Sequence, residues 1–296
     1  MKNLKVYPHN SIDVHLNAIN RKNASYSKIT LFSIENNVRT DYAEYDLCFQ
    51  QNNIENIPKN HFYIPFFSDL QSLYDYQSKT IIEVRGHIEK LQLRTIRNTC
   101  QNCTINSANT LDHILPKGEF PQFIVNPKNL FPCCSQCNSY KNKNLESNGI
   151  KLFLNLYLDN LPDEQYLFVN FDFDENNEID FEYFLDNKYE INVKTYKLIE
   201  SHFNKLHLLE RMRLKANEDY SEIENSILSG LNNLSIDLIV DEIRKNIIND
   251  QKAYGFNHWK CVLKLALIDD KRYREYIEDL FTKLSLTKTD GEKKIY

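Results

Sequence analysis

Four cysteines in two Cys-x-x-Cys pairs are the residues best suited to chemistry in this 296-residue chain. The pairs are Cys100/Cys103 and Cys134/Cys137. Thiolates at this spacing are common ligands of structural zinc, because a tight turn places two sulfurs on one ion and a second pair completes the tetrahedral shell. We therefore predict one Zn²⁺ held by all four thiolates, the alternative being a set of reduced, buried cysteines. Cys133 has the wrong spacing to join the set and is left as a spare thiol.

Residues suited to hydrolysis lie between and just after the cysteine pairs. Asp112 and His113 are adjacent, and Asn138 directly follows the second pair. An imidazole with a pKa near 6.5 can take a proton from water at neutral pH, and carboxylate and amide oxygens suit Mg²⁺ or Mn²⁺. Neighbouring side chains of a regular strand point to opposite faces, so Asp112 and His113 can share a site only where the strand ends or bends. Pro116 and Gly118 favour a strand end there.

These motifs, in this order inside the cysteine frame, resemble those of the HNH endonucleases, whose active site is a β-hairpin and a helix around one metal ion. The family's first His matches His113, in the motif Asp-His-x-x-Pro. Its central Asn matches Asn129, in Asn-Leu-x-x-x-Cys, and its third position, often His, is taken by Asn138. The resemblance covers residues 80–145 or so and implies a ββα-metal fold fastened by the zinc knuckles.

The resemblance also implies a role for each residue. His113 would be the general base, and Asp112 and Asn138 would hold the catalytic Mg²⁺ or Mn²⁺. Asn129 would lock the loop and orient His113, and Lys141 would meet a phosphate oxygen. The function expected is a metal-dependent endonuclease that hydrolyses phosphodiester bonds in DNA. The alternative is a catalytically degenerate, zinc-stabilised adaptor that binds nucleic acid or protein.

The rest of the chain predicts an α+β fold that is mostly helical. We expect the small HNH module with its structural zinc at residues 78–150, between a mixed α/β region at 1–77 and a β-hairpin plus helical region at 151–296 used for packing or partner binding. The patterns behind this are β-like alternation at 26–34, a helical stripe at 78–98, alternation at 166–173 and 179–183, and helical stripes from 193 to 284 with breaks near 217–220 and 250–256.

Charge is unevenly distributed along the chain. The net charge is −5, yet residues 85–150 carry eight basic and four acidic side chains, a local charge of +4. The remaining residues then carry 28 basic and 37 acidic side chains, or −9. A basic module in an acidic protein suits a surface that faces phosphate, and the plainer explanation is ordinary fluctuation of charge along a sequence.

The sequence also indicates where the protein works and with what. No apolar run reaches the roughly 18 residues of a membrane span, and the N-terminus lacks an apolar signal core. We therefore expect a cytoplasmic protein with no membrane partner, whose thiols stay reduced. Besides DNA, we expect self-association through the helical C-terminal region. A chain with this core and these flanks also resembles the nuclease arms of bacterial antiphage systems, which implies an ATPase as partner; a restriction-like or mobile-element nuclease is the alternative.

Overall fold

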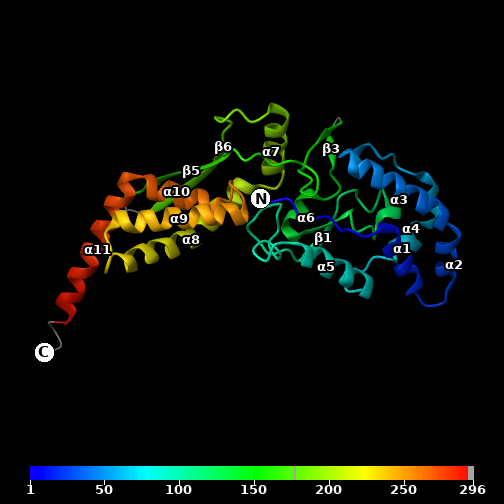
Figure 1. Ribbon diagram of the computed structural model, residues 1–296, viewed down its shortest axis with the longest axis horizontal. Helices are drawn as coiled ribbons and strands as arrows, with labels where there is room; N and C mark the ends of the chain where they lie inside the picture. The colour runs from blue at the N-terminus through cyan, green and yellow to red at the C-terminus, as the bar shows by residue number, and fades with distance from the viewer. Residues whose placement is uncertain (148, 176–177, 293–296) are drawn as a thin grey trace. The chain divides into compact units, whose positions relative to one another are not determined.

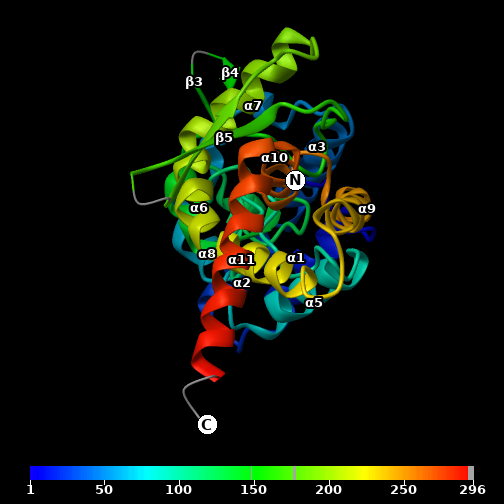
Figure 2. The ribbon, with the colours of Figure 1, turned by 90° about the vertical axis from the view of Figure 1, so that its left-hand side faces the viewer.

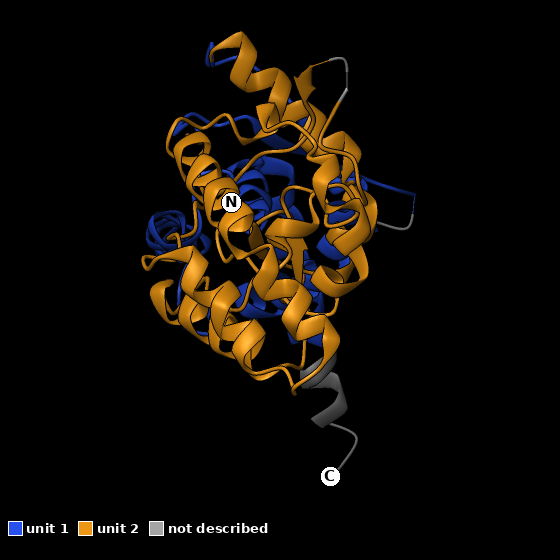
Figure 3. Ribbon diagram, turned by 90° about the vertical axis from the view of Figure 1, so that its right-hand side faces the viewer, with its two compact units in different colours: residues 1, 162–191, 207–296 blue, residues 2–161, 192–206 orange. Residues whose placement is uncertain are grey.

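The chain folds into two compact units, which Figure 3 colours separately. The structure is a computed structural model that describes residues 1–147, 149–175 and 178–292. Unit 1 contains residue 1, residues 162–191 and residues 207–296, and unit 2 contains residues 2–161 and 192–206. Both units combine helices with antiparallel strand pairs, so the predicted α+β class is confirmed. Unit 2 holds all of the candidate site residues.

The N-terminal part of unit 2 is helical. Its elements are α1 (Ser11–Asn20), α2 (Tyr26–Ser33), α3 (Glu35–Gln50), α4 (Phe67–Gln71) and the short 3₁₀ turns η1 (Ile54–Asn56) and η2 (His61–Phe66). Residues 1–77 are all described and contain no strand, so the mixed α/β character predicted for this region is wrong.

The β-like alternation at residues 26–34 belongs to the helix α2. Ser25 caps this helix by accepting a hydrogen bond from the backbone N–H of Lys28 at 3.3 Å. The helix buries Leu31, whereas Tyr26 and Ile29 are 84% and 69% exposed. Because exposed apolar residues interrupt the helical stripe, the sequence pattern could not be told from a strand.

Helix α5 (Lys79–Leu91) confirms the helix predicted from Ser78, but it ends well before Asn98. The amide Nε2 of Gln92 donates to the backbone carbonyl of Ile88 at 2.8 Å. The same amide exchanges two hydrogen bonds with the backbone of Lys5. Gln92 thereby caps the helix and fastens it to the N-terminal segment, which ends the helix there.

The centre of unit 2 is a β-hairpin followed directly by a helix. Strands β1 (Thr110–His113) and β2 (Leu130–Cys133) pair antiparallel, from Thr110 opposite Cys133 to His113 opposite Leu130. The loop between them contains η3 (Pro121–Phe123), and α6 (Ser135–Lys141) follows β2 and contacts β1. The strand ends at His113, as Pro116 and Gly118 indicated. The other elements of this unit are the strand pair β3 (Glu146–Ser147) and β4 (Ile150–Lys151), and α7 (Val193–Lys205).

In its described residues, unit 1 is a β-hairpin packed with four helices. Strands β5 (Leu167–Phe173) and β6 (Ile179–Leu185) confirm the predicted hairpin. The helices are α8 (Leu208–Gly230), α9 (Ile236–Tyr254), α10 (Trp259–Asp269) and α11 (Lys271–Glu292). Figures 1 and 2 show these yellow-to-red helices gathered together. Helix α10 contacts β5, and α8 contacts β6.

Helix α8 is continuous through the break predicted near Asn217–Tyr220. Asp219 in that segment forms an ion pair with Lys260 at 2.8 Å, and the Tyr220 ring packs 5.7 Å from Phe181. These tertiary contacts hold the polar turn in helical form. The second predicted break is confirmed, because α9 ends at Tyr254 before Gly255, whose φ is +99°. Among the described residues, no helix is long and apolar enough to cross a bilayer.

Candidate metal centre and adjoining groove

The four cysteines of the two Cys-x-x-Cys pairs form one buried cluster. Their Sγ atoms all lie within 4.8 Å of one another. The Sγ atoms of Cys103 and Cys134 are 3.9 Å apart, close to the ~3.8 Å expected between two sulfurs bound tetrahedrally to one zinc ion at ~2.3 Å. No disulfide links the cysteines. In the described part of the chain this is also the one group of three or more His, Cys, Asp or Glu side chains close enough together to share a metal ion.

Backbone geometry around the cluster favours thiolates. The N–H of Ile105 donates to the sulfur of Cys103, and the N–H of Cys137 donates to the sulfur of Cys134, each at 3.4 Å. Hydrogen bonds from Cys100 and other neighbouring thiols lower the pKa of Cys134 well below its usual value, and hydrogen bonding led by Cys100 lowers the pKa of Cys103 to about 7. In the same cluster, hydrogen bonding led by Cys103 raises the pKa of Cys100. The hydrogen bond of Cys100 lowers the pKa of Cys137, but those of Cys103 and Cys134 outweigh it and raise that pKa. Cys100 and Cys137 therefore lose their protons only when a cation binds. The donor set, its spacing and its burial therefore fit a structural zinc ion.

Two distant segments form hydrogen bonds to the turn of the first cysteine pair, and a third orients one of them. The backbone N–H of Lys2 donates to the Oε1 atom of Gln101 at 2.9 Å. From α7, the Nε2 atom of His202 bonds the carbonyl of Asn102 at 2.9 Å, and its Nδ1 atom accepts from the N–H of Leu154 at 3.2 Å. A carbonyl can only accept, so Nε2 of His202 carries the proton. This turn is therefore a junction of unit 2, and His202 is a structural histidine.

An open groove of about 730 Å³ lies beside the cluster. Its lining comes from the segment before α5, from β1, from the loop after β1 and from α6, and includes Tyr74, Asp112, His113, Lys117, Asn138 and Lys143. Asp112 and His113 both line it although they are neighbours on a strand, because His113 is the last residue of β1. The sequence-predicted residues Asp112, His113 and Asn138 are thus brought to one surface.

The His113 imidazole is oriented by the loop between the strands. Its Nε2 atom lies 2.9 Å from the carbonyl oxygen of Ile124. Because that oxygen can only accept, Nε2 carries the proton and Nδ1 carries the lone pair in the neutral ring. Burial lowers the pKa of His113 to about 4, with Lys117 and Lys141 adding to the effect. The ring is therefore neutral at pH 7 and can accept a proton at Nδ1.

Asn129 fixes the loop that carries Ile124. Its Oδ1 atom accepts from the N–H of Leu115 at 2.7 Å, and its Nδ2 atom donates to the carbonyls of Leu115 and Phe123 at 3.1 and 3.3 Å. The Tyr45 hydroxyl, from α3, donates to the same Oδ1 at 3.3 Å. Asn129 is fully buried and does not line the groove, so it acts on His113 through the loop.

Asp112 and Lys141 form a buried ion pair. The Lys141 Nζ atom lies 2.7 Å from Oδ2 of Asp112, and the two side chains are 8% and 7% exposed. The ammonium also donates to the carbonyls of His113 and Ile114, at 3.0 and 3.5 Å. Burial raises the pKa of Asp112, and Lys141 opposes that rise. The ammonium is therefore occupied, and contact with a phosphate, as expected from the sequence, requires this ion pair to open.

Asn138 and Cys133 complete the neighbourhood. The Nδ2 atom of Asn138 lies 3.5 Å from the Thr110 hydroxyl, an orientation that assigns Oδ1 as the atom able to contact a cation.

Cys133 is buried opposite Thr110 on the hairpin and lies outside the metal cluster, and burial raises its pKa. It is an inert thiol, as its spacing indicated.

One contact to the imidazole has no signal in the sequence. The Tyr74 ring lies 4.7 Å from the His113 ring in an edge-to-face arrangement. Tyr74 precedes α5 in a region without a motif, and only the fold brings it to the hairpin.

Comparisons with protein-family models, with curated proteins and with solved structures found no match to this chain.

Proposed function

We propose that the protein is a metal-dependent endonuclease of the HNH type, with the groove beside the cysteine cluster as its active site. The observation that carries the proposal is the placement of His113 and Asp112 on one groove, with the imidazole neutral and its Nε2 proton bound to Ile124. Hydrolysis of a phosphodiester needs a base for water and a cation for developing negative charge. His113 would take the proton from the attacking water at Nδ1.

A pKa of about 4 makes the imidazole a weak base in the free protein. A phosphate in the groove would raise it, since nearby negative charge favours the imidazolium. Water in the groove could therefore be activated only once substrate is bound.

The divalent cation would be held by hard oxygen ligands. Asp112 and Asn138 both line the groove and offer a carboxylate and an amide oxygen, with water and phosphate oxygens to complete the shell. Oδ2 of Asp112 is bonded to Lys141, which leaves Oδ1 for a metal ion. When bound there, Mg²⁺ or Mn²⁺ would neutralise charge on the phosphate oxygens.

Two lysines support a phosphate substrate. Lys117 and Lys143 line the groove, and neither forms an ion pair with any described residue. The only acidic residue in the lining is Asp112, which is already neutralised by Lys141. The groove is therefore positive when empty, which favours a polyanion such as DNA.

The test is cleavage of supercoiled plasmid with Mg²⁺ or Mn²⁺, with zinc content measured on the same samples. The wild type should nick or cut, and His113→Ala should lose this activity while keeping its zinc. His87→Ala is the matched control, because His87 is exposed on α5 and lies outside the groove lining. Equal cutting by His113→Ala would show that the reaction does not take place in this groove.

The buried Asp112–Lys141 pair favours a second function. In a site that has lost its activity, the carboxylate would also be bound by an ammonium in place of a metal ion, as Asp112 is bound by Lys141. A zinc-stabilised adaptor would bind nucleic acid or protein through the same unit without cutting. Absence of cleavage by the wild type, with partners supplied, together with intact DNA binding, would favour this adaptor.

A further inference from the structure

Beside the groove lies a second hollow, of about 320 Å³, that contains two arginines. We call it the arginine pocket. Arg85 comes from α5 and Arg97 from the turn that leads to the first cysteine pair. The pocket shares Tyr76, Thr110 and Leu111 with the groove, so the two hollows adjoin along β1.

The two arginines have unsatisfied hydrogen-bonding groups. The Nε atoms of Arg85 and Arg97 are both buried and have no hydrogen-bond partner. Neither guanidinium forms an ion pair with a described residue. A buried donor without a partner is costly, and the oxygens of an anion in the pocket would satisfy it.

The Arg85 guanidinium is also held in position. Its Cζ atom lies 3.9 Å from the centroid of the Tyr76 ring, so the planar group is stacked on the tyrosine. A stacked guanidinium keeps its edge available, and that edge matches two phosphate oxygens. Glu89 also lines the pocket but is exposed and pairs with neither arginine. The pocket therefore retains a net positive charge of one.

We propose that the arginine pocket is a phosphate-binding subsite, in which Arg85 and Arg97 hold the nucleic-acid backbone next to the phosphate that is cut. This inference rests on the proposed nuclease function. It assigns the substrate a path from the lysines of the groove, past Thr110, to the two arginines. The contacts are to phosphate, so the subsite positions the strand and does not read its sequence.

The test is binding of fluorescein-labelled single-stranded and duplex oligonucleotides, followed by fluorescence anisotropy in a His113→Ala background that cannot cut. Arg85→Gln and Arg97→Gln should each raise the Kd several-fold, with similar effects for oligonucleotides of different sequence. Each should also lower the slope of log K against log salt by about 0.9 for a duplex. Arg94→Gln is the matched control: Arg94 is exposed in the same turn and does not line the pocket.

Arg85→Lys separates geometry from charge. This variant keeps the positive charge but loses the planar guanidinium, which can bind two phosphate oxygens and stack on Tyr76. Its Kd should therefore lie between those of the wild type and Arg85→Gln. Circular dichroism and the thermal midpoint check folding of every variant. If Arg85→Gln does not fold, Arg97→Gln and Arg85→Lys carry the test.

The outcomes separate this inference from the proposed function. Binding by Arg85→Gln and Arg97→Gln equal to that of Arg94→Gln would overturn the subsite, even if plasmid is cut. Arginine-dependent binding without any cutting by the wild type would keep the subsite and remove the nuclease. Calorimetry with ATP and inorganic phosphate covers the other source of phosphate. Arginine-dependent binding of these small anions, with oligonucleotide binding unchanged, would make the pocket a mononucleotide site and overturn the proposal.

Discussion

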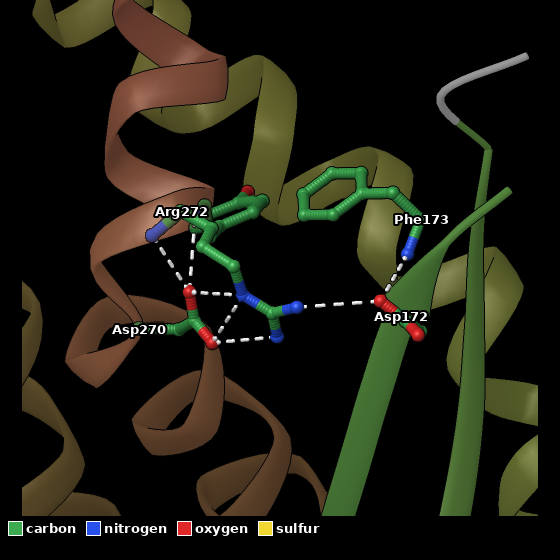
Figure 4. Close-up of polar contacts among 5 residues, drawn as sticks. Asp172, Phe173, Asp270 and Arg272 are labelled. Carbon is green, nitrogen blue, oxygen red and sulfur yellow. Dashed lines mark hydrogen bonds and ion pairs between the residues drawn. The ribbon is translucent and has the colours of Figure 1, made fainter. Parts of the chain in front are cut away.

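Two aspartate–cation pairs, one in each unit of the molecule, differ sharply in burial. In unit 2, Asp112 and Lys141 are buried, and the ammonium also binds two backbone carbonyls. In unit 1, Arg272 pairs with Asp270 at 3.0 Å and with Asp172 at 3.3 Å, as Figure 4 shows. The side chains of Arg272 and Asp172 are 58% and 85% exposed. The exposed pair is screened by water, whereas the buried pair has one fixed geometry and a large desolvation cost.

The two units also differ in how many polar side chains they bury. Unit 2 places polar side chains in its interior and fixes them by hydrogen bonds between distant segments, as Asn129 and His202 show. Unit 1 also buries a hydrogen-bonded amide, Asn257, but most of its paired charges are on the surface. Both units pack aromatic rings, Tyr45 against Phe123 in unit 2 and Phe181 against Tyr220 in unit 1. Buried and oriented polar groups are what chemistry requires, so this contrast directs the functional proposal to unit 2.

The largest expected effect follows loss of the metal. Cys134→Ser should release zinc and unfold much of unit 2, because the three remaining thiols and the serine hydroxyl lose the cation that holds this buried cluster together. Helices of unit 1 should persist. Zinc content, far-UV circular dichroism and limited proteolysis measure these outcomes. Cys48→Ser, which alters a cysteine outside the cluster, is the control. Unchanged proteolysis in zinc-free Cys134→Ser would show that unit 2 folds without its metal.

The next largest effect concerns the buried ion pair. Lys141→Met leaves Asp112 buried without its cation and should lower the free energy of unfolding by about 3 to 5 kcal/mol. Lys143 is exposed and lies two residues further along the chain, so Lys143→Met should change the free energy of unfolding little. The double variant Asp112→Asn/Lys141→Met should recover part of the loss, since no charge is left unpaired. Urea denaturation measures all three, and equal midpoints for Lys141→Met and Lys143→Met would contradict the assignment.

A smaller, pH-dependent effect comes from His202. Burial lowers its pKa from 6.5 to about 4, so between these values the unfolded chain binds a proton that the folded protein does not. The free energy of unfolding should therefore fall as the pH drops from about 6.5 to 4, by at most about 3 kcal/mol for this group. His202→Asn should flatten this part of the pH profile, measured by urea denaturation at each pH. A profile as steep as that of the wild type would show that His202 does not contribute.

The smallest effect is expected in unit 1. Arg272→Gln removes the two ion pairs that the guanidinium forms, with Asp270 and Asp172 (Figure 4). It should not measurably change the thermal midpoint, because the arginine is exposed and its pairs are screened. A clear decrease in the midpoint would show that the contrast between the two units is less sharp than their burial indicates.

Local sequence signals predicted much of unit 2. The spacing of Cys100, Cys103, Cys134 and Cys137 was enough to predict the cluster, because knuckle geometry is set by a few adjacent residues. The strand end after His113 followed in the same way from Pro116 and Gly118. Arrangements of distant segments had no such signal. The contact of Tyr74 with His113, the ion pair of Lys141 with Asp112, and the pocket lined by both Arg85 and Arg97 all depend on tertiary structure.

Errors in secondary structure have the same origin. In α2, apolar side chains face solvent, so periodicity pointed to a strand. In α8, a polar segment read as a break is held helical by Lys260 and Phe181, which are far away in the chain. Propensity and pattern describe what a segment prefers alone, and packing decided these two cases otherwise.

Anomalous diffraction from crystals grown with Mn²⁺ and a short oligonucleotide tests the central claim most directly. We predict a zinc peak between the four sulfurs and a separate manganese peak in the groove, next to Oδ1 of Asp112 and the amide oxygen of Asn138, with a phosphate near Nδ1 of His113. A structure with nucleic acid bound elsewhere, and with no manganese beside Asp112, would contradict the account.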